Sequence, residues 1–163
     1  MTVPWERAAR SWQVLFAAGL FACSVAWADE RAFITNQSAQ SVSVVALPRM
    51  EVLATLPVAG KPAGVAAAPD GRHVYVSSPE GAFVSVLATD PPAVLRRIEL
   101  EGGPLGIAVH PSGRPLYVAD WYAGRVFVVD PETGDRLAEL ETGASPSGLA
   151  LSQVVSQTEQ PNL

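Results

Sequence analysis

The chain has 163 residues, and its 16 acidic and 11 basic side chains give a net charge of −5 at pH 7. A negative chain with no basic stripe is a poor candidate for binding nucleic acid or an anionic membrane surface. Hydrophobic residues make up 48% of the sequence, which provides ample apolar surface for a core.

Residues 1–28 have the pattern of a secretory signal peptide. Arg7 and Arg10 precede an apolar stretch at 14–25, and the segment ends in an Ala-Trp-Ala sequence. This arrangement predicts cleavage between Ala28 and Asp29, and therefore a periplasmic or secreted protein. The apolar stretch is shorter than the roughly 20 residues that a membrane-spanning helix needs.

Cys23 opens an alternative for this segment. The sequence Leu-Phe-Ala-Cys at 20–23 resembles a lipoprotein signal, in which Cys23 would carry the lipid anchor. If cleavage follows Ala28 instead, no cysteine remains, because Cys23 is the only one in the chain. Disulfides and thiolate metal sites are then excluded.

The rest of the chain is dominated by an internal repeat with a period of 42 residues. Eight positions between 104 and 128 match the residues 42 positions earlier, as in Pro104 on Pro62 and Gly106 on Gly64. The period extends backwards to 33–44 and forwards to 146–149. A fixed period of this length is typical of a repeat architecture. The copies lie near 31–71, 72–113 and 114–151.

Each repeat predicts four β-strands. Runs of alternating apolar residues are separated by glycine- and proline-rich turns, among them Pro-Asp-Gly at 69–71 and Pro-Ser-Gly at 111–113. Strands with such short connections pair antiparallel, so each repeat is expected to form a four-stranded meander. The predicted fold is an all-β propeller of four-stranded antiparallel blades, with about three blades and an incomplete ring.

The segments FITN at 33–36, YVSS at 75–78 and YVAD at 117–120 resemble the YVTN family of β-propeller repeats. The resemblance covers residues 32–151. It implies a bacterial exported propeller, similar to those associated with pyrroloquinoline-quinone dehydrogenase systems. The Asp that this family has after the third strand is replaced by Ala46 and Ala88 and is retained only at Asp130.

The number of blades leaves two interpretations open. Residues 148–151 predict a final strand, which in a closed ring would complete the first blade, and the pattern is lost in a polar tail at 152–163. Propellers have typically four to eight blades. The chain is therefore either a truncated remnant of a longer propeller or half of a homodimer that completes a six-bladed ring.

Candidate binding residues come from the loops, because propeller strands mostly pack. Alternate connections of a meander lie on one face, so the loops after the YV strands share a face with those before each first strand. Trp121 and Tyr122 stand side by side there as possible recognition anchors, although one ring could instead cover the neighbouring blade and the other its edge. The predicted ligand- or partner-binding face comprises Asn36, Gln37, Lys61, Glu80, Asp120, Trp121, Tyr122 and Arg125.

The sequence shows no catalytic constellation. His73 and His110 occupy different positions of the repeat, so nothing brings two imidazoles together for a metal. Glu139 and Glu141, like Glu99 and Glu101, alternate along a strand and are expected to form a solvated edge. We therefore expect an exported, non-catalytic binding or scaffold module with no metal and no cofactor, whose protein or small-molecule partner is unknown. The alternatives are a propeller enzyme, similar to lactonases or to quinone- or haem-dependent oxidoreductases, or an inactive fragment.

Overall fold

The computed structural model describes residues 30–152, which fold entirely as β-strands and connecting loops. The predicted signal peptide, Cys23 and nearly all of the polar tail lie outside the described residues. The strands are β1 (Arg31–Asn36), β2 (Ser41–Ala46), β3 (Glu51–Pro57), β4 (Val65–Ala67), β5 (His73–Ser78), β6 (Phe83–Thr89), β7 (Pro92–Glu99), β8 (Pro104–Val109), β9 (Leu116–Asp120), β10 (Arg125–Val129) and β11 (Arg136–Glu141).

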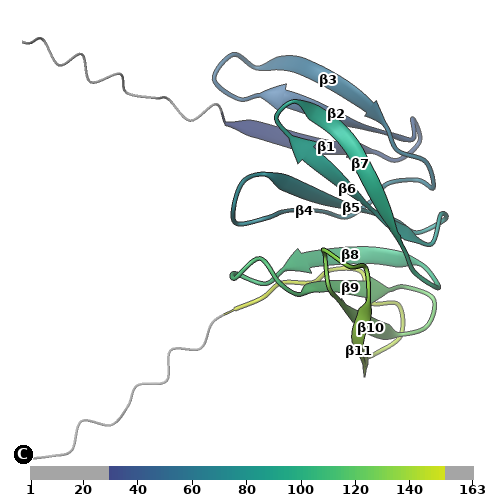
Figure 1. The fold of residues 1–163 in the computed structure, drawn as a ribbon. Helices are drawn as coiled ribbons and strands as arrows, with labels where there is room; N and C mark the ends of the chain where they lie inside the picture. The colour runs from purple at the N-terminus through teal and green to yellow at the C-terminus, as the bar shows by residue number, and fades with distance from the viewer. Residues whose placement is uncertain (1–29, 153–163) are drawn as a thin grey trace, which may run out of the picture.

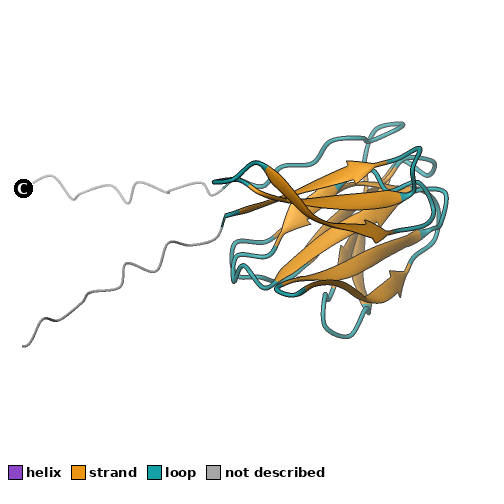
Figure 2. Ribbon diagram, turned by 90° about the horizontal axis from the view of Figure 1, so that it is seen from above, coloured by secondary structure: helices purple, strands orange, loops and turns teal. Residues whose placement is uncertain are grey.

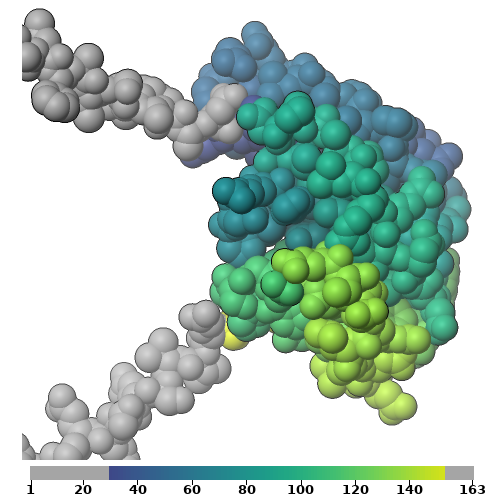
Figure 3. Space-filling model, in the orientation of Figure 1, coloured from purple at the N-terminus to yellow at the C-terminus, as the bar shows by residue number. Residues whose placement is uncertain are grey.

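These strands form three antiparallel meanders, which confirms the predicted propeller blades. Blade 1 is the sheet β1-β2-β3, blade 2 is β4-β5-β6-β7 and blade 3 is β8-β9-β10-β11. The blades stack in chain order, with blade 2 between blades 1 and 3 (Figures 1 and 3). Blade 1 lacks the strand that corresponds to β4 and β8, so β1 corresponds to β5 and β9, the second strands of blades 2 and 3. Each sequence repeat therefore begins at the second strand of one blade and ends with the first strand of the next, which joins consecutive blades.

The repeat is also visible in the irregularities of the sheets. The pairing of β2 with β3 shifts register between Val44 and Val45, and the pairings of β6 with β7 and of β10 with β11 shift at the same repeat position. Gly71 and Gly113, in the two predicted turns, have φ angles of 68° and 89°, which residues with a side chain rarely adopt. The local sequence therefore sets the same strand bends and turns in each copy.

Apolar side chains fill the two spaces between blades. One buried cluster joins blades 1 and 2 through Val42, Val58, Val74, Val76 and Leu87. The other joins blades 2 and 3 and includes Tyr75, Val84, Val86, Ile98, Ile107, Leu116, Val118, Phe127 and Val129. Burial of one such side chain contributes about 1.5–3 kcal/mol. Packing between blades therefore supplies most of the core.

The first strands also approach the preceding blade closely. A Cβ atom on Gly64 would lie 2.2 Å from the carbonyl oxygen of Leu105, and one on Gly106 would lie 2.5 Å from that of Ser147. The residues are again 42 apart. The chain at Ser147 therefore runs along β8 as β8 runs along β4, at the place of the first strand of a fourth blade.

The final strand predicted at residues 148–151 is not formed, which corrects that part of the prediction. In blades 2 and 3 the first strand pairs with the second strand of its own blade, β4 with β5 and β8 with β9. Among residues 30–152 there is no further second strand for 148–151 to pair with, so no ladder of hydrogen bonds defines a strand. Blade 1 has the complementary gap, because β1 is its edge strand.

Candidate functional site: the loop face

Loops gather at the two ends of the blades (Figure 2). Those that the sequence assigns to one face do lie together at one end, here called the loop face. They are tied by backbone hydrogen bonds from Glu80 N to Gly60 O, at 3.2 Å, and from Trp121 N to Gly103 O, at 2.9 Å. Each bond joins the loop after a second strand to the loop before a first strand. The strands alternate in direction, and this alone brings the two sets of loops to the same end.

A groove of about 200 Å³ crosses this face and brings together five of the eight predicted residues. Lys61 and Glu80 form an ion pair with 2.6 Å between Nζ and Oε1, and both side chains are half exposed. The groove is lined by Gln37, Lys61, Pro79, Glu80, Leu105, Trp121 and Tyr122. It draws on loops of all three blades, which are far apart in sequence.

Both aromatic rings of the groove are exposed, and the backbone N–H groups of Trp121 and Tyr122 are both hydrogen-bonded. The ring of Tyr122 lies over Gly103, where a Cβ atom would be only 2.6 Å from the ring. Gly103 and Tyr122 occupy the repeat positions of Lys61 and Glu80. A salt bridge on blade 2 is thus replaced on blade 3 by an aromatic ring on a glycine, and the rings are presented to solvent on an ordered loop.

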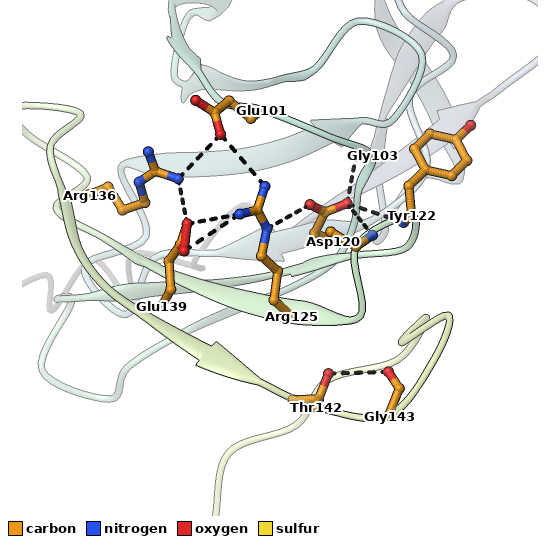
Figure 4. Close-up of polar contacts among 10 residues, drawn as sticks. Glu101, Gly103, Asp120, Tyr122, Arg125, Arg136, Glu139, Thr142 and Gly143 are labelled. Carbon is orange, nitrogen blue, oxygen red and sulfur yellow. Dashed lines mark hydrogen bonds and ion pairs between the residues drawn. The ribbon is translucent and has the colours of Figure 1, made fainter.

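Asp120 lies beneath this loop, fully buried. Its Oδ1 accepts hydrogen bonds from the backbone N–H groups of Gly103, Tyr122 and Ala123 at 2.8, 3.1 and 3.3 Å, and its Oδ2 accepts one from Arg125 Nε at 3.0 Å (Figure 4). Burial raises the pKa of Asp120, but these hydrogen bonds outweigh it and lower the pKa below its ordinary value. Asp120 therefore positions the Trp121–Tyr122 loop and is not accessible to a ligand.

Asn36 occupies the repeat position of Asp120 in blade 1, and its amide is bonded to neighbouring serines. Its Nδ2 donates to Ser43 Oγ at 2.8 Å and to Ser41 Oγ at 3.3 Å, which ties the ends of β1 and β2 together. In blade 2 the position is Ser78, whose buried hydroxyl has no hydrogen-bond partner among the described residues. The same repeat position thus holds three different polar groups, none of which lines the groove.

Arg125 points away from the groove into a network of charges. It forms ion pairs with Glu139 at 3.1 Å and Glu101 at 3.6 Å, and Arg136 contacts the same two carboxylates (Figure 4). The hydrogen bond to Asp120 is the largest cause that raises the pKa of Arg125. Its guanidinium also lies 4.6 Å from the centre of the Phe127 ring. Two members of the network, Arg125 and Glu139, line an open hollow of about 530 Å³ at the edge of blade 3.

The sequence did not reveal this network or a cavity at the opposite end of the blades. Glu101 and Glu139 were expected only as parts of a solvated edge, and the basic partners come from different strands. The cavity, of about 490 Å³, lies between blades 2 and 3 and is lined in part by Tyr75, Arg96 and Arg114. Burial is the largest cause that raises the pKa of Tyr75. The sequence signal for this cavity is that the Pro-Asp-Gly turn at 69–71 and the Pro-Ser-Gly turn at 111–113, which form part of its rim, occupy the same repeat position.

Each of the two histidines contacts a residue of the turn beside it. His73 Nδ1 is 3.8 Å from Asp70 Oδ2, and His110 Nδ1 is 2.7 Å from Ser112 Oγ within its turn. Residues 30–152 contain no group of three or more His, Cys, Asp or Glu side chains that could hold a metal ion. The described part of the chain also has no helix that could cross a membrane.

Comparison with known proteins supports the fold. No protein-family model matches the chain, and no curated protein matches it. Among solved structures it is similar to Kuenenia stuttgartiensis hydrazine synthase, with 27% identity and a TM-score of 0.68 over 72% of this chain and 34% of that one. It is also similar to the dihydro-heme d1 dehydrogenase NirN in complex with DHE, with 19% identity and a TM-score of 0.60 over 69% of this chain and 24% of that one.

The three blades and these similarities define the chain as a β-propeller protein. It spans about a third of the length of the hydrazine synthase chain and about a quarter of the dehydrogenase chain. The similarity to the dehydrogenase is below 25% identity and supports the fold alone. One fold hosts many activities, so function has to be argued from the loop face.

Proposed function

We propose that this chain is an exported, non-catalytic β-propeller module of the YVTN type that binds a partner at its loop face. The groove between Lys61, Glu80, Trp121 and Tyr122 is the observation that carries the proposal. Exposed aromatic rings on an ordered loop are suited to recognition, because little conformational entropy is lost on binding. Export rests on the signal-like pattern of residues 1–28, and an accessory role in periplasmic quinoprotein oxidation rests on the family resemblance.

The sequence supplies a direct probe of this site. Trp121 is the only tryptophan after residue 27, so an exported chain cleaved after Ala28 has a single indole, located in the groove. The mass of the exported protein tests the cleavage. Its tryptophan emission can then be titrated with candidate partners, beginning with periplasmic quinoproteins. A change in emission that is abolished by Tyr122→Ala supports the loop face. Binding that leaves the emission unchanged, or that Tyr122→Ala does not weaken, contradicts it.

The names of the structural neighbours favour one alternative function. Hydrazine synthase and a dihydro-heme d1 dehydrogenase are both named as enzymes, the latter in complex with DHE. A propeller enzyme that holds a quinone or haem would absorb visible light when purified from its own host. A visible absorption band with a stoichiometry near one per chain would therefore support this enzyme and contradict the binding module. A lactonase-like activity would be tested by hydrolysis of lactones.

We also propose that two chains share one ring. The described residues form three blades, so two copies supply six, which is within the range of closed propellers. Light scattering after size exclusion tests this directly, since a dimer mass is required and a monomer contradicts it. The ring and the loop-face groove are independent proposals, because the groove is already formed within one chain.

A further inference from the structure

The outward side of blade 3 has the residues of a blade interface but lacks the burial of one. Tyr75, Val84, Val86 and Ile98 are the side chains with which blade 2 packs on blade 3. In blade 3 the same repeat positions hold Tyr117, Val126, Val128 and Leu140, of which only Val126 is buried. Ile98 is 3% exposed, whereas Leu140 is 51% exposed. Blade 3 therefore presents a surface that, one repeat earlier, is covered by a further blade.

The opposite end of the stack shows the complementary feature. Val76 packs between blades 1 and 2 and is fully buried, whereas Ile34, at its repeat position in β1, is 43% exposed. Phe33 packs toward blade 2, so Ile34 points to the other side of the sheet. It shares that outer side with Ser43, its cross-strand partner. Blade 1 thus presents the surface that blades 2 and 3 each use to contact the preceding blade.

The two gaps in hydrogen bonding are complementary as well. β1 is an edge strand with no first strand beside it, and residues 148–151 lie at the place of a first strand with no second strand to pair with. The observed pairs Val65↔Val76 and Ile107↔Val118 are related by the 42-residue period. The same period specifies the missing pair as Leu149↔Ile34, followed by Ala150↔Phe33 and Leu151↔Ala32.

We infer that blade 3 of one chain binds blade 1 of a second copy, and that residues 149–151 of the first chain pair antiparallel with residues 32–34 of the second. This inference rests on the two-chain ring proposed above and specifies its interface. Two such contacts related by a twofold axis close the ring, because each copy contributes one donor end and one acceptor end. Each copy then completes the first blade of the other.

The register can be tested with introduced disulfides. Directly opposed residues on antiparallel strands have Cα atoms about 4.5–5.5 Å apart, within the range that a disulfide spans. Ile34→Cys with Leu149→Cys, made with Cys23→Ser so that no other thiol is present, should form a covalent dimer on mild oxidation. Within one chain, Ile34 lies in β1 of blade 1 and residue 149 follows the segment that runs along β8 of blade 3. Blades 1 and 3 are at opposite ends of the stack (Figure 1), so a bond within a chain is not expected.

Three controls define the outcome. Neither single variant should cross-link, whereas a mixture of the two should yield a dimer with one disulfide. Ile34→Cys with Ala150→Cys should not cross-link, because residues shifted by one point to opposite sides of the sheet. A dimer by light scattering with no Ile34–Leu149 disulfide would overturn the inference but leave the two-chain ring. A monomer would overturn both the strand pairing and the two-chain ring, and the exposed face of blade 3 would then have to be covered by blades of another polypeptide.

A second test uses two leucines of β11. Leu140 corresponds to buried Ile98, whereas Leu137 corresponds to Leu95, which is 53% exposed although blade 3 already covers blade 2. Leu140→Glu should therefore weaken dimer formation by about tenfold or more, since it places a charge in the interface. Leu137→Glu should leave it unchanged. Equal effects of the two substitutions, or none from Leu140→Glu, would overturn the inference.

Discussion

The substitution Asp120→Asn tests whether a buried carboxylate holds the aromatic loop of the groove. Asn keeps the size of the side chain but removes the charge that faces Arg125 Nε at 3.0 Å. Its amide group must either point a donor at Arg125 or withdraw an acceptor from the backbone N–H groups of Gly103, Tyr122 and Ala123. One buried interaction is lost in either orientation.

The expected loss of stability is about 3 kcal/mol. Removing one partner of a buried ion pair typically costs about 3–5 kcal/mol, and the low end applies because Arg125 keeps Glu139 and Glu101 as partners. For a domain of this size the melting temperature should fall by roughly 10 °C. Thermal unfolding followed by circular dichroism measures this. Glu141→Gln, an equivalent change at an exposed position of β11, should alter stability by less than about 0.5 kcal/mol.

The effect of Asp120→Asn on stability should depend on pH in a defined direction. The pKa of Asp120 is lower in the folded chain than the value of about 3.9 in an unfolded one, so its charge stabilises the fold above about pH 4. This contribution is lost as the pH falls below 4 through the lowered folded pKa. The gap in melting temperature between wild type and Asp120→Asn should therefore be full at pH 7 and shrink below pH 4.

Asp130 does not affect this comparison. The hydrogen bond from Glu132 N is the largest cause that lowers the pKa of Asp130, but this carboxylate is present in both proteins and cancels. A gap that stays constant or widens on acidification would refute the role assigned to Asp120. So would equal melting temperatures of the two proteins at pH 7.

Two further substitutions test the contacts between blades. Gly64→Ala should destabilise the fold by several kcal/mol or prevent folding, because the new Cβ would lie 2.2 Å from Leu105 O. Gly143→Ala, whose Cβ would have no atom within 4 Å, should be neutral in the same melting experiment. Ala119→Ser should raise stability by about 0.5–1.5 kcal/mol, because the new hydroxyl can donate a hydrogen bond to Ser147 O. The residues at this repeat position in blades 1 and 2, Thr35 and Ser77, each donate such a bond. A loss of stability would show that the buried site cannot hold the added oxygen.

Divergence between repeats explains why the groove lies where it does. Lys61 and Glu80 on blade 2 are replaced on blade 3 by Gly103 and Tyr122, so only one blade places a ring on a glycine. Backbone bonds tie the loop pair together in each blade, from Glu80 N to Gly60 O on blade 2 and, offset by one residue within the repeat, from Trp121 N to Gly103 O on blade 3. A shared backbone with different side chains is how a repeat fold acquires a local site.

Much of the fold could be predicted from the sequence, because its determinants are local and repeated. Alternating apolar residues define the strands, turn glycines such as Gly71 and Gly113 define where they end, and the 42-residue period defines the blades. The face on which Gln37, Lys61, Glu80, Trp121 and Tyr122 meet follows from the alternation of strand direction alone.

Tertiary structure decided which polar residues are accessible and which strands form. Asp120 is buried because backbone N–H groups from another segment bond its carboxylate, and Arg125 is drawn into a network of charges from other segments. Asn36 is bonded to the serine hydroxyls of β2. Residues 148–151 have the sequence of a strand, yet a strand needs a partner at its edge, and none lies there among the described residues. Sequence patterns specify the conformation that a segment prefers, whereas hydrogen-bond partners and burial depend on segments that only the folded chain brings together.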